Sequence, residues 1–189
     1  LDAGPTLNFL AAGQQGVLIR TAERRDLQLT VPERVDREVF GKSQSALFKR
    51  TPASATWRKL KSASRIAILS DDLTTAAFTA AVARISGMPA EKRLTDRNSL
   101  GEIMVLAHAS TLAQAGTDIF VLMDERDGRR RCGREKQWLE RHDAPGRLTL
   151  WSTRQVLKQA DPDWFAGGCT TWEQVYNQMR PFDLALTAL

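Results

Sequence analysis

Short apolar segments alternate with helix-like segments along nearly the whole chain, and this alternation sets the class of fold. The expected strands cover residues 27–31, 65–69, 119–123 and 148–151, and a further short strand ends at Asp2 before a Gly-Pro turn. The expected helices, placed by their start and stop residues, cover 6–12, 33–40, 43–50, 52–62, 72–86, 99–115, 128–142, 153–160 and 171–180. Alternating strands and helices predict an α/β fold, in which a mainly parallel sheet is covered by helices on both faces.

Polar residues in front of two of these helices are expected to cap them. The Ser-Asp-Asp run at 70–72 stands at the start of the Ala-rich helix 72–86, which Gly87 should end. Asn98 or Ser99 stands before the helix 99–115. Side chains of these types accept hydrogen bonds from the free N–H groups of a first helical turn, so they favour helix starts.

The overall composition is that of a globular protein. The length of 189 residues fits one compact domain with extensions, and 42% hydrophobic with 26% charged residues excludes a mostly disordered chain. No apolar run approaches the roughly 20 residues that cross a bilayer, and no signal peptide is visible. The two cysteines, Cys132 and Cys169, lie far apart, which is typical of a reducing cytosol. We therefore expect a cytoplasmic protein with no membrane partner.

Positive charge is concentrated in two parts of the chain. The formal net charge is +5, yet residues 39–70 alone carry seven basic and no acidic residues. A second basic cluster occupies residues 126–136, where only Asp127 and Glu135 oppose the arginines and the lysine. A one-sided positive potential attracts polyanions, above all phosphate backbones. A solvated helix face is the alternative explanation of the same pattern.

Ligands of a parallel sheet bind beyond the carboxyl ends of its strands, and carboxylates stand at those places in the sequence. Each of them ends a strand or lies on the helix that follows: Asp2, Glu38, Glu102, Asp124 and Asp127. Carboxylates brought close together raise one another's pKa, and a bound divalent cation removes that cost. All-oxygen ligands suit Mg²⁺ or Mn²⁺, whereas the sequence has no Cys/His cluster that would suit zinc.

Four short stretches, in this order along the chain, resemble motifs of the PIN-domain ribonucleases, a family that includes the toxins of many bacterial toxin–antitoxin pairs. They are Asp2-Ala3-Gly4-Pro5, Val35-Asp36-Arg37-Glu38-Val39, Gly101-Glu102 and Phe120-Val121-Leu122-Met123-Asp124-Glu125-Arg126-Asp127-Gly128-Arg129. The resemblance implies a three-layer sandwich with a central, mainly parallel sheet. It makes residues 1–155 a nuclease domain, with 41–98 as an enlarged helical region and 156–189 as a C-terminal helical extension.

The resemblance also implies roles for individual residues. Its catalytic acidic quartet consists of Asp2, Glu38, Glu102 and Asp124. It further implies Asp127 as an additional metal ligand or the fourth acid, and Ser152 as a hydroxyl near the metal. Asp36 competes with Glu38 for one place, although Val35 and Val39 favour Glu38 at the buried edge. The residues expected to contact RNA are all basic: Arg126, Arg129, Arg130, Lys59 and Lys61.

The sequence therefore predicts an endoribonuclease that uses Mg²⁺ or Mn²⁺ to hydrolyse RNA phosphodiester bonds, and a toxin of a toxin–antitoxin pair is one form that this family takes. The alternative is a catalytically inactive PIN-like module that binds RNA or protein. A haloacid-dehalogenase-like phosphatase is excluded, because Arg126 stands two residues after Asp124 where that chemistry needs a second aspartate. The sequence contains no Gly-rich phosphate loop that would indicate a nucleotide site. The implied partners are RNA, a small antitoxin and a second copy of the chain.

Overall fold

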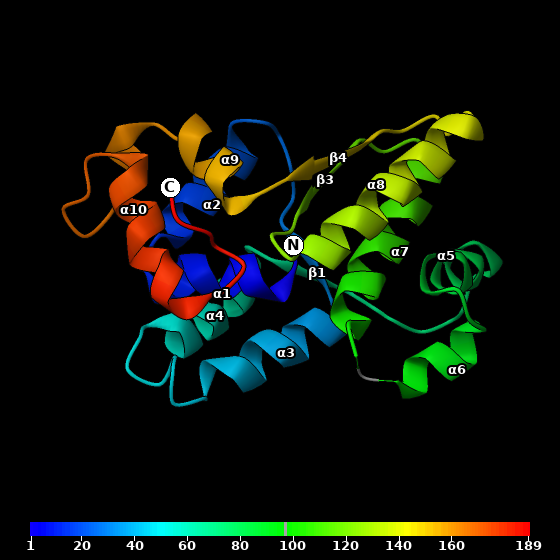
Figure 1. Ribbon diagram of the computed structural model, residues 1–189, viewed down its shortest axis with the longest axis horizontal. Helices are drawn as coiled ribbons and strands as arrows, with labels where there is room; N and C mark the ends of the chain where they lie inside the picture. Colours follow the sequence, from blue (N-terminus) through cyan, green and yellow to red (C-terminus); the bar gives the residue numbers. More distant parts are fainter. Residues whose placement is uncertain (97) are drawn as a thin grey trace.

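The computed structural model describes residues 1–96 and 98–189 as a mixed α/β fold with four short strands among many helices (Figure 1). The first half contains α1 (Ala3–Ala11), α2 (Gln15–Glu23), β1 (Thr30–Pro32), α3 (Glu33–Ser43), α4 (Ala53–Ser62), β2 (Ala67–Leu69), α5 (Ala76–Ser86) and α6 (Ala90–Thr95). The second half contains α7 (Leu100–Gln114), β3 (Ile119–Leu122), α8 (Arg126–Arg141), β4 (Leu148–Trp151), α9 (Thr153–Gln159) and α10 (Trp172–Met179). Single 3₁₀ turns cover Pro162–Trp164 and Arg180–Phe182.

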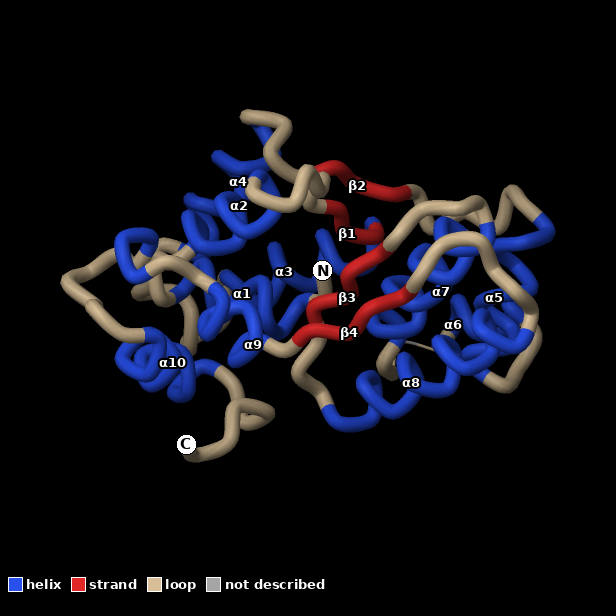
Figure 2. The backbone as a smooth tube through the Cα atoms, turned by 90° about the horizontal axis from the view of Figure 1, so that it is seen from above, coloured by secondary structure: helices blue, strands red, loops and turns tan. Residues whose placement is uncertain are grey.

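The strands form two parallel pairs, and the first residues of the chain join them. β1 pairs with β2 and β3 pairs with β4. The Leu1 nitrogen donates to the Thr30 carbonyl at 2.8 Å, and the Asp2 N–H donates to the Leu122 carbonyl at 3.1 Å. Figure 2 shows the N-terminus between β1 and β3. The segment expected to be a strand ending at Asp2 thus lies between the pairs, with too few bonds to form a ladder.

In Figure 2 the helices α1 and α3 lie to the left of the strands, α7 to their right and α8 below them, and no described helix crosses in front of the strands in that view. The mixed α/β class is therefore confirmed, whereas the three-layer arrangement stays a prediction. α7 is buried around most of its circumference, as a helix that is apolar on all sides must be. It packs against α3, α5 and α8, and so holds its first turn at the centre of the molecule.

Start and stop residues in the sequence predicted most of the helices and strands, but not all of the positions at which they begin and end. Gly87 ends α5 in the left-handed conformation (φ 73°), as expected. α5 starts later than expected, because the Thr75 side chain accepts from the Phe78 N–H. Asp71 caps a different helix, with its Oδ2 accepting from the Arg34 N–H of α3 at 2.6 Å. The expected helix over 43–50 is absent: residue 43 ends α3 and residues 44–50 form turns beyond it, whereas α2 and α6 were not expected.

The C-terminal part packs against the start of the chain. Val156 and Leu157 of α9, together with Val175 and Met179 of α10, share a buried cluster with Phe9 of α1 and further residues of α2 and β3. The expected boundary between residues 155 and 156 falls inside α9. No helix in residues 1–96 and 98–189 is both long enough and apolar enough to cross a membrane.

Candidate acidic site

Six carboxylates from five parts of the chain line one open cavity of about 550 Å³. They come from the N-terminus, α3, α7, the start of α8 and the C-terminal segment: Asp2, Glu38, Glu102, Glu125, Asp127 and Asp183. Two basic side chains, Arg34 and Lys42, line the same cavity. The topology therefore brings together three of the four predicted quartet acids, along with the predicted additional acid.

Asp2 is the most deeply buried of these carboxylates. It stands at the N-cap of α1 in an extended conformation, yet its side chain makes no capping hydrogen bond. Its backbone is held by Leu122 on β3, so the side chain is carried at the carboxyl end of that strand. Burial raises the pKa of Asp2 to about 6, and the nearby negative charge of Glu38 adds to the rise. A hydrogen bond from the Ala3 N–H lowers this pKa, but by less than burial raises it.

Glu102 lies in the first turn of α7 and forms an ion pair with Arg131 of α8 at 3.2 Å. Burial raises its pKa to about 7, and the charge of Asp2 is the next contribution. The positive charge of Arg131 opposes this rise but does not cancel it. Asp2 and Glu102 therefore act on each other although 100 residues separate them in the sequence.

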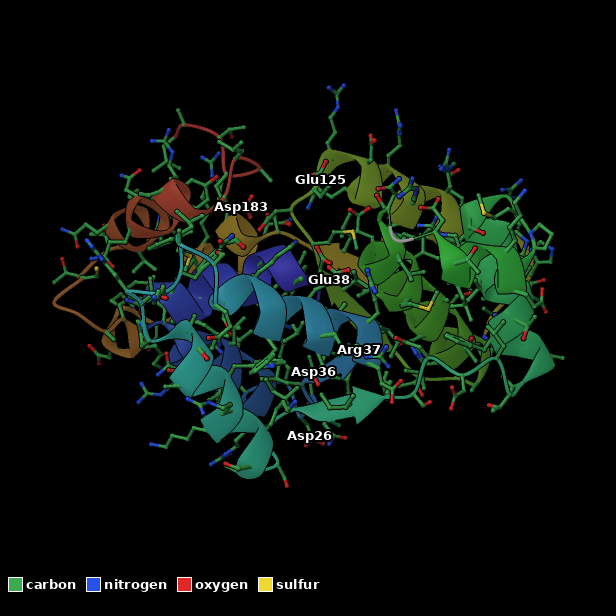
Figure 3. All side chains as sticks on the ribbon, turned by 90° about the horizontal axis from the view of Figure 1, so that it is seen from below. Asp26, Asp36, Arg37, Glu38, Glu125 and Asp183 are labelled. Carbon is green, nitrogen blue, oxygen red and sulfur yellow. The ribbon has the colours of Figure 1, made fainter. Side chains whose placement is uncertain are left out.

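Glu38 and Asp36 point to opposite sides of α3, as residues two apart on a helix do (Figure 3). Glu38 lines the acidic cavity and pairs with Arg34 at 3.1 Å. Asp36 accepts from Lys61 Nζ at 2.7 and 2.8 Å and from the Trp57 indole N–H at 2.8 Å. Of the two competing acids, Glu38 is the one at the cavity, and Asp36 serves to attach α4 to α3.

Glycines let the helices bring these carboxylates close to neighbouring backbone. A Cβ at Gly101 would lie 3.0 Å from both carboxylate oxygens of Glu38. A Cβ at Gly128 would lie 2.9 Å from Oε2 of Glu102. At the contact of α3 with α7, the Glu38 carboxylate thus packs against Gly101. At the contact of α7 with α8, the Glu102 carboxylate packs against Gly128. Larger residues at Gly101 and Gly128 would displace the acids.

Asp124, the predicted acid at the end of β3, does not line the cavity. Its Oδ1 accepts from the Thr153 N–H at 2.9 Å and its Oδ2 from the Thr153 hydroxyl at 2.5 Å. The carboxylate thereby satisfies the free N–H at the start of α9. Burial raises the pKa of Asp124, and the hydrogen bonds from Thr153 lower it. The structure gives this residue a capping role beside the cavity.

Several other predicted contacts also have local partners. Ser152 forms a capping box with Gln155 at the start of α9, so its hydroxyl serves that helix. Arg129 donates to the Met123 carbonyl at 3.0 Å, and Arg130 pairs with Asp127 at 3.1 Å. Arg126 and Lys59 are exposed, whereas Lys61 is bound to Asp36.

Two acids of the cavity were missing from the predicted set. Glu125 directly follows Asp124 in an acidic run that is visible in the sequence, but no role was assigned to it there. Asp183 lies in the C-terminal segment, where it accepts from the Asn8 side chain at 2.7 Å and from the Ala185 N–H at 2.9 Å. No local pattern around Asp183 indicates a site, because α1 and the 3₁₀ turn before it fix its place.

The donor chemistry of the cavity suits a hard divalent cation. Among the described residues, no group of three or more His, Cys, Asp or Glu side chains is close enough to form a complete metal site. Mg²⁺ does not require one, because it commonly binds through one or two carboxylates, several waters and the phosphates of a substrate. Burial is the largest cause of the raised pKa values of Asp2 and Glu102, so ionised carboxylates there are poorly solvated and a bound cation would stabilise them. The residues therefore fit Mg²⁺ or Mn²⁺.

Comparisons of the chain with family models, with curated proteins and with solved structures found no match. Function must accordingly be argued from the acidic cavity and the charges around it. These features are a set of desolvated carboxylates and, on α8 beside them, a high density of arginines.

Proposed function

We propose that this chain is a metal-dependent endoribonuclease with a PIN-like fold and an acidic site formed by Asp2, Glu38 and Glu102. The observation that carries the proposal is that these three acids, distant in sequence, line one cavity in which two of them have raised pKa values. Such a cluster destabilises the folded protein unless something positive binds to it. Structural ion pairing does not explain Asp2, since its side chain forms none of the ion pairs of the described structure. The Ala3 N–H and the charges of the N-terminus and Lys42 offset only part of the cost of its burial.

Asp2 and Glu102 would hold the cation, with Glu38 completing the wall of the site. When bound, Mg²⁺ or Mn²⁺ would activate a water molecule as nucleophile and neutralise charge on the phosphate. Arg131 holds the Glu102 carboxylate in place through its ion pair. Arg34 and Lys42 line the same cavity and are placed to meet non-bridging phosphate oxygens. Asp124 and Thr153 fix the end of β3 against α9, which keeps the Leu122 carbonyl in position for Asp2.

The balance of charge supports a polyanionic substrate rather than a small neutral one. An acidic cavity alone repels phosphate, so binding of RNA there requires both a cation in the cavity and basic residues around it. The chain has 27 basic against 22 acidic residues, and α8 begins at the cavity and carries many of the basic ones. This arrangement predicts affinity that falls with salt and depends little on base sequence.

The test is cleavage of a labelled mixed-sequence RNA by the purified protein with Mg²⁺, with Mn²⁺ and with EDTA. We expect cleavage with at least one ion, none in EDTA, and loss of at least 100-fold in rate for Glu102→Gln. Glu140→Gln is the matched control, because Glu140 is an exposed acid of α8 with a weak 3.8 Å ion pair and should retain the wild-type rate. Circular dichroism would show that both variants fold.

Two results would overturn the assignment: no cleavage by the wild type with either ion, or cleavage by Glu102→Gln at the wild-type rate. RNA binding without any metal-dependent cleavage would instead support the inactive PIN-like module. The hydrogen bonds from Thr153 to both oxygens of Asp124 favour that second candidate, because they occupy an acid that the family resemblance places in the catalytic quartet. A toxin role, with a small antitoxin covering the cavity or with a second copy of the chain, is a further part of the proposal.

A further inference from the structure

One face of α8 connects the acidic cavity to a second, basic cavity. The residues on this face recur at spacings of four and three, which places them in a single row along a helix: Asp127, Arg131, Arg134, Trp138 and Arg141. Asp127 lines the acidic cavity, and the other four line a cavity of about 460 Å³ between α8 and the end of α5. The row is about 21 Å long at 1.5 Å per residue. We call these five residues the α8 row.

Arg131 belongs to both sites. It pairs with Glu102 of the acidic cavity at 3.2 Å, and it also lines the basic cavity. Because α8 is a continuous helix, the two cavities are held at a fixed separation. A ligand long enough to occupy both would meet carboxylates at one end and guanidinium groups at the other.

Of the four arginines that line the basic cavity, Arg84 and Arg131 have an acidic partner, and the other two have none in the described part of the chain. Its one acid is Glu135, which is buried and accepts two hydrogen bonds from the Arg84 guanidinium, at 2.5 and 3.2 Å, and one from the Ser110 hydroxyl at 2.5 Å. Arg84 and Glu135 therefore neutralise each other as a built-in pair. Arg134 and Arg141 are exposed and form no ion pair with any acid in the described part of the chain. Arg141 donates only its Nε–H, to the Gln137 carbonyl at 3.2 Å, so its terminal nitrogens and the Arg134 guanidinium remain available to an anion.

Stacked side chains form the wall of the basic cavity and leave, among its described residues, no free aromatic ring on which an RNA base could stack. The Arg84 guanidinium carbon lies 3.5 Å from the centre of the Trp138 ring, and the His142 ring stacks on Trp138 with centroids 4.0 Å apart. Trp138 thus already stacks with protein groups. What the cavity presents is guanidinium charge, which suits phosphate groups and carries no sequence preference.

We propose that the basic cavity binds the backbone of a single RNA strand that extends from the acidic cavity along the α8 row. This inference rests on the proposed nuclease function for the place of the scissile phosphate. A single row of arginines on one helix follows one phosphate backbone, whereas a duplex presents two. The row also differs from the contacts expected from the sequence, since Arg129, Arg130 and Lys61 are engaged by local partners.

The test measures RNA binding in EDTA, which prevents cleavage. Without its cation the acidic cavity does not attract phosphate, so the binding that remains reports on the basic cavity. Fluorescence anisotropy would follow a labelled 12-nucleotide single strand with the wild type and with Arg134→Gln/Arg141→Gln. We expect at least a tenfold weaker affinity for the double variant at low salt. The slope of log K against log salt should fall by about 1.4, since each phosphate contact on a single strand contributes about 0.7.

The matched control is Arg147→Gln/Arg180→Gln, which removes the same charge from two exposed arginines outside the α8 row. It should bind within twofold of the wild type. Equal losses in both double variants, no loss in the row variant, or tighter binding of a duplex than of the single strand would each overturn the inference. Equal competition by a polyglutamate peptide would overturn it as well, because phosphate would then not be what is recognised.

A kinetic measurement separates this inference from the nuclease proposal. With saturating metal, the row variant should raise the KM for the 12-mer about tenfold and leave kcat within twofold. If the protein binds RNA through the row but never cleaves it, the nuclease proposal fails and the RNA-binding row stands. If it cleaves and the row variant keeps the wild-type KM, the row has no role in binding.

Discussion

Replacing Asp2 by asparagine should make the protein more stable while removing its function. Burial raises the pKa of Asp2 from its ordinary 3.8 to about 6, so ionising this carboxyl at neutral pH costs the folded state about 3 kcal/mol. The side chain is only 7% exposed, and the amide oxygen of asparagine can still accept the hydrogen bond from the Ala3 N–H. Above pH 7 the variant should therefore gain up to about 3 kcal/mol, or about 6 to 12 °C in Tm.

The gain must depend on pH in a defined direction. Because the folded pKa is the higher one, the folded protein binds the extra proton between about pH 4 and 6, and wild-type stability falls as the pH rises through that range. Asp2→Asn has no such proton. Its advantage should vanish near pH 4, grow between pH 4 and 6, and level off above pH 7. Urea denaturation at several pH values measures this difference directly.

Asp36→Asn is the matched control for the same chemical change. Asp36 accepts from Lys61 and from Trp57, so its loss should lower the unfolding free energy by about 1 to 3 kcal/mol at pH 7. Opposite signs for the two substitutions are the expected result. If Asp2→Asn is as destabilising as Asp36→Asn, then the carboxylate of Asp2 is a stabilising structural group and the reasoning is refuted.

Metal provides a second measurement on the same two variants. An ion at 100 times its Kd should raise the unfolding free energy of the wild type by about 2.7 kcal/mol. Asp36→Asn should show the same rise, and Asp2→Asn should show little of it. A full metal-induced rise in Asp2→Asn would remove this residue from the candidate site.

Two further substitutions test the packing around the cavity. Gly101→Ala should weaken Mn²⁺ binding by at least tenfold in a titration, because the added Cβ would lie 3.0 Å from the Glu38 carboxylate oxygens. Gly133→Ala is the control, because a Cβ there meets open space. It should leave the Mn²⁺ affinity unchanged and raise the unfolding free energy by up to about 1 kcal/mol. Thr153→Val removes the hydroxyl that donates to Asp124 and should lower the unfolding free energy by about 1 to 2 kcal/mol in urea. An unchanged urea midpoint would show that this hydrogen bond contributes nothing.

Sequence patterns located β3 and β4 well, because each is a short apolar run with a clear polar boundary. They could not show that the two strands pair, and this pairing determines which groups the Asp124 side chain contacts. Pairing brings the end of β3 beside the start of α9, where Thr153 engages the carboxylate. Asp124 thus lies at the end of β3, as the sequence predicts, but its carboxylate contacts Thr153 and does not line the acidic cavity.

The acids at the cavity show the same division between local and distant causes. Asp2 and Glu102 were found because each stands at a strand end or in the first turn of a helix. Asp183 was missed because a contact with Asn8, 175 residues away, fixes its position. Asp71 was expected to cap α5 and instead caps α3. The pairing of β1 with β2 brings the residues that follow β2 beside the start of α3, which follows β1. Tertiary contacts determined each of these outcomes.

The position of Leu1 and Asp2 between β1 and β3 has a consequence for biosynthesis. A ribosome releases these residues before their hydrogen-bonding neighbours at Thr30 and Leu122, and Asp183 emerges later still. The acidic cavity consequently cannot be completed on a growing chain before Asp183 has emerged. Until then its carboxylates lie on separate parts of the nascent chain and cannot bind one cation together.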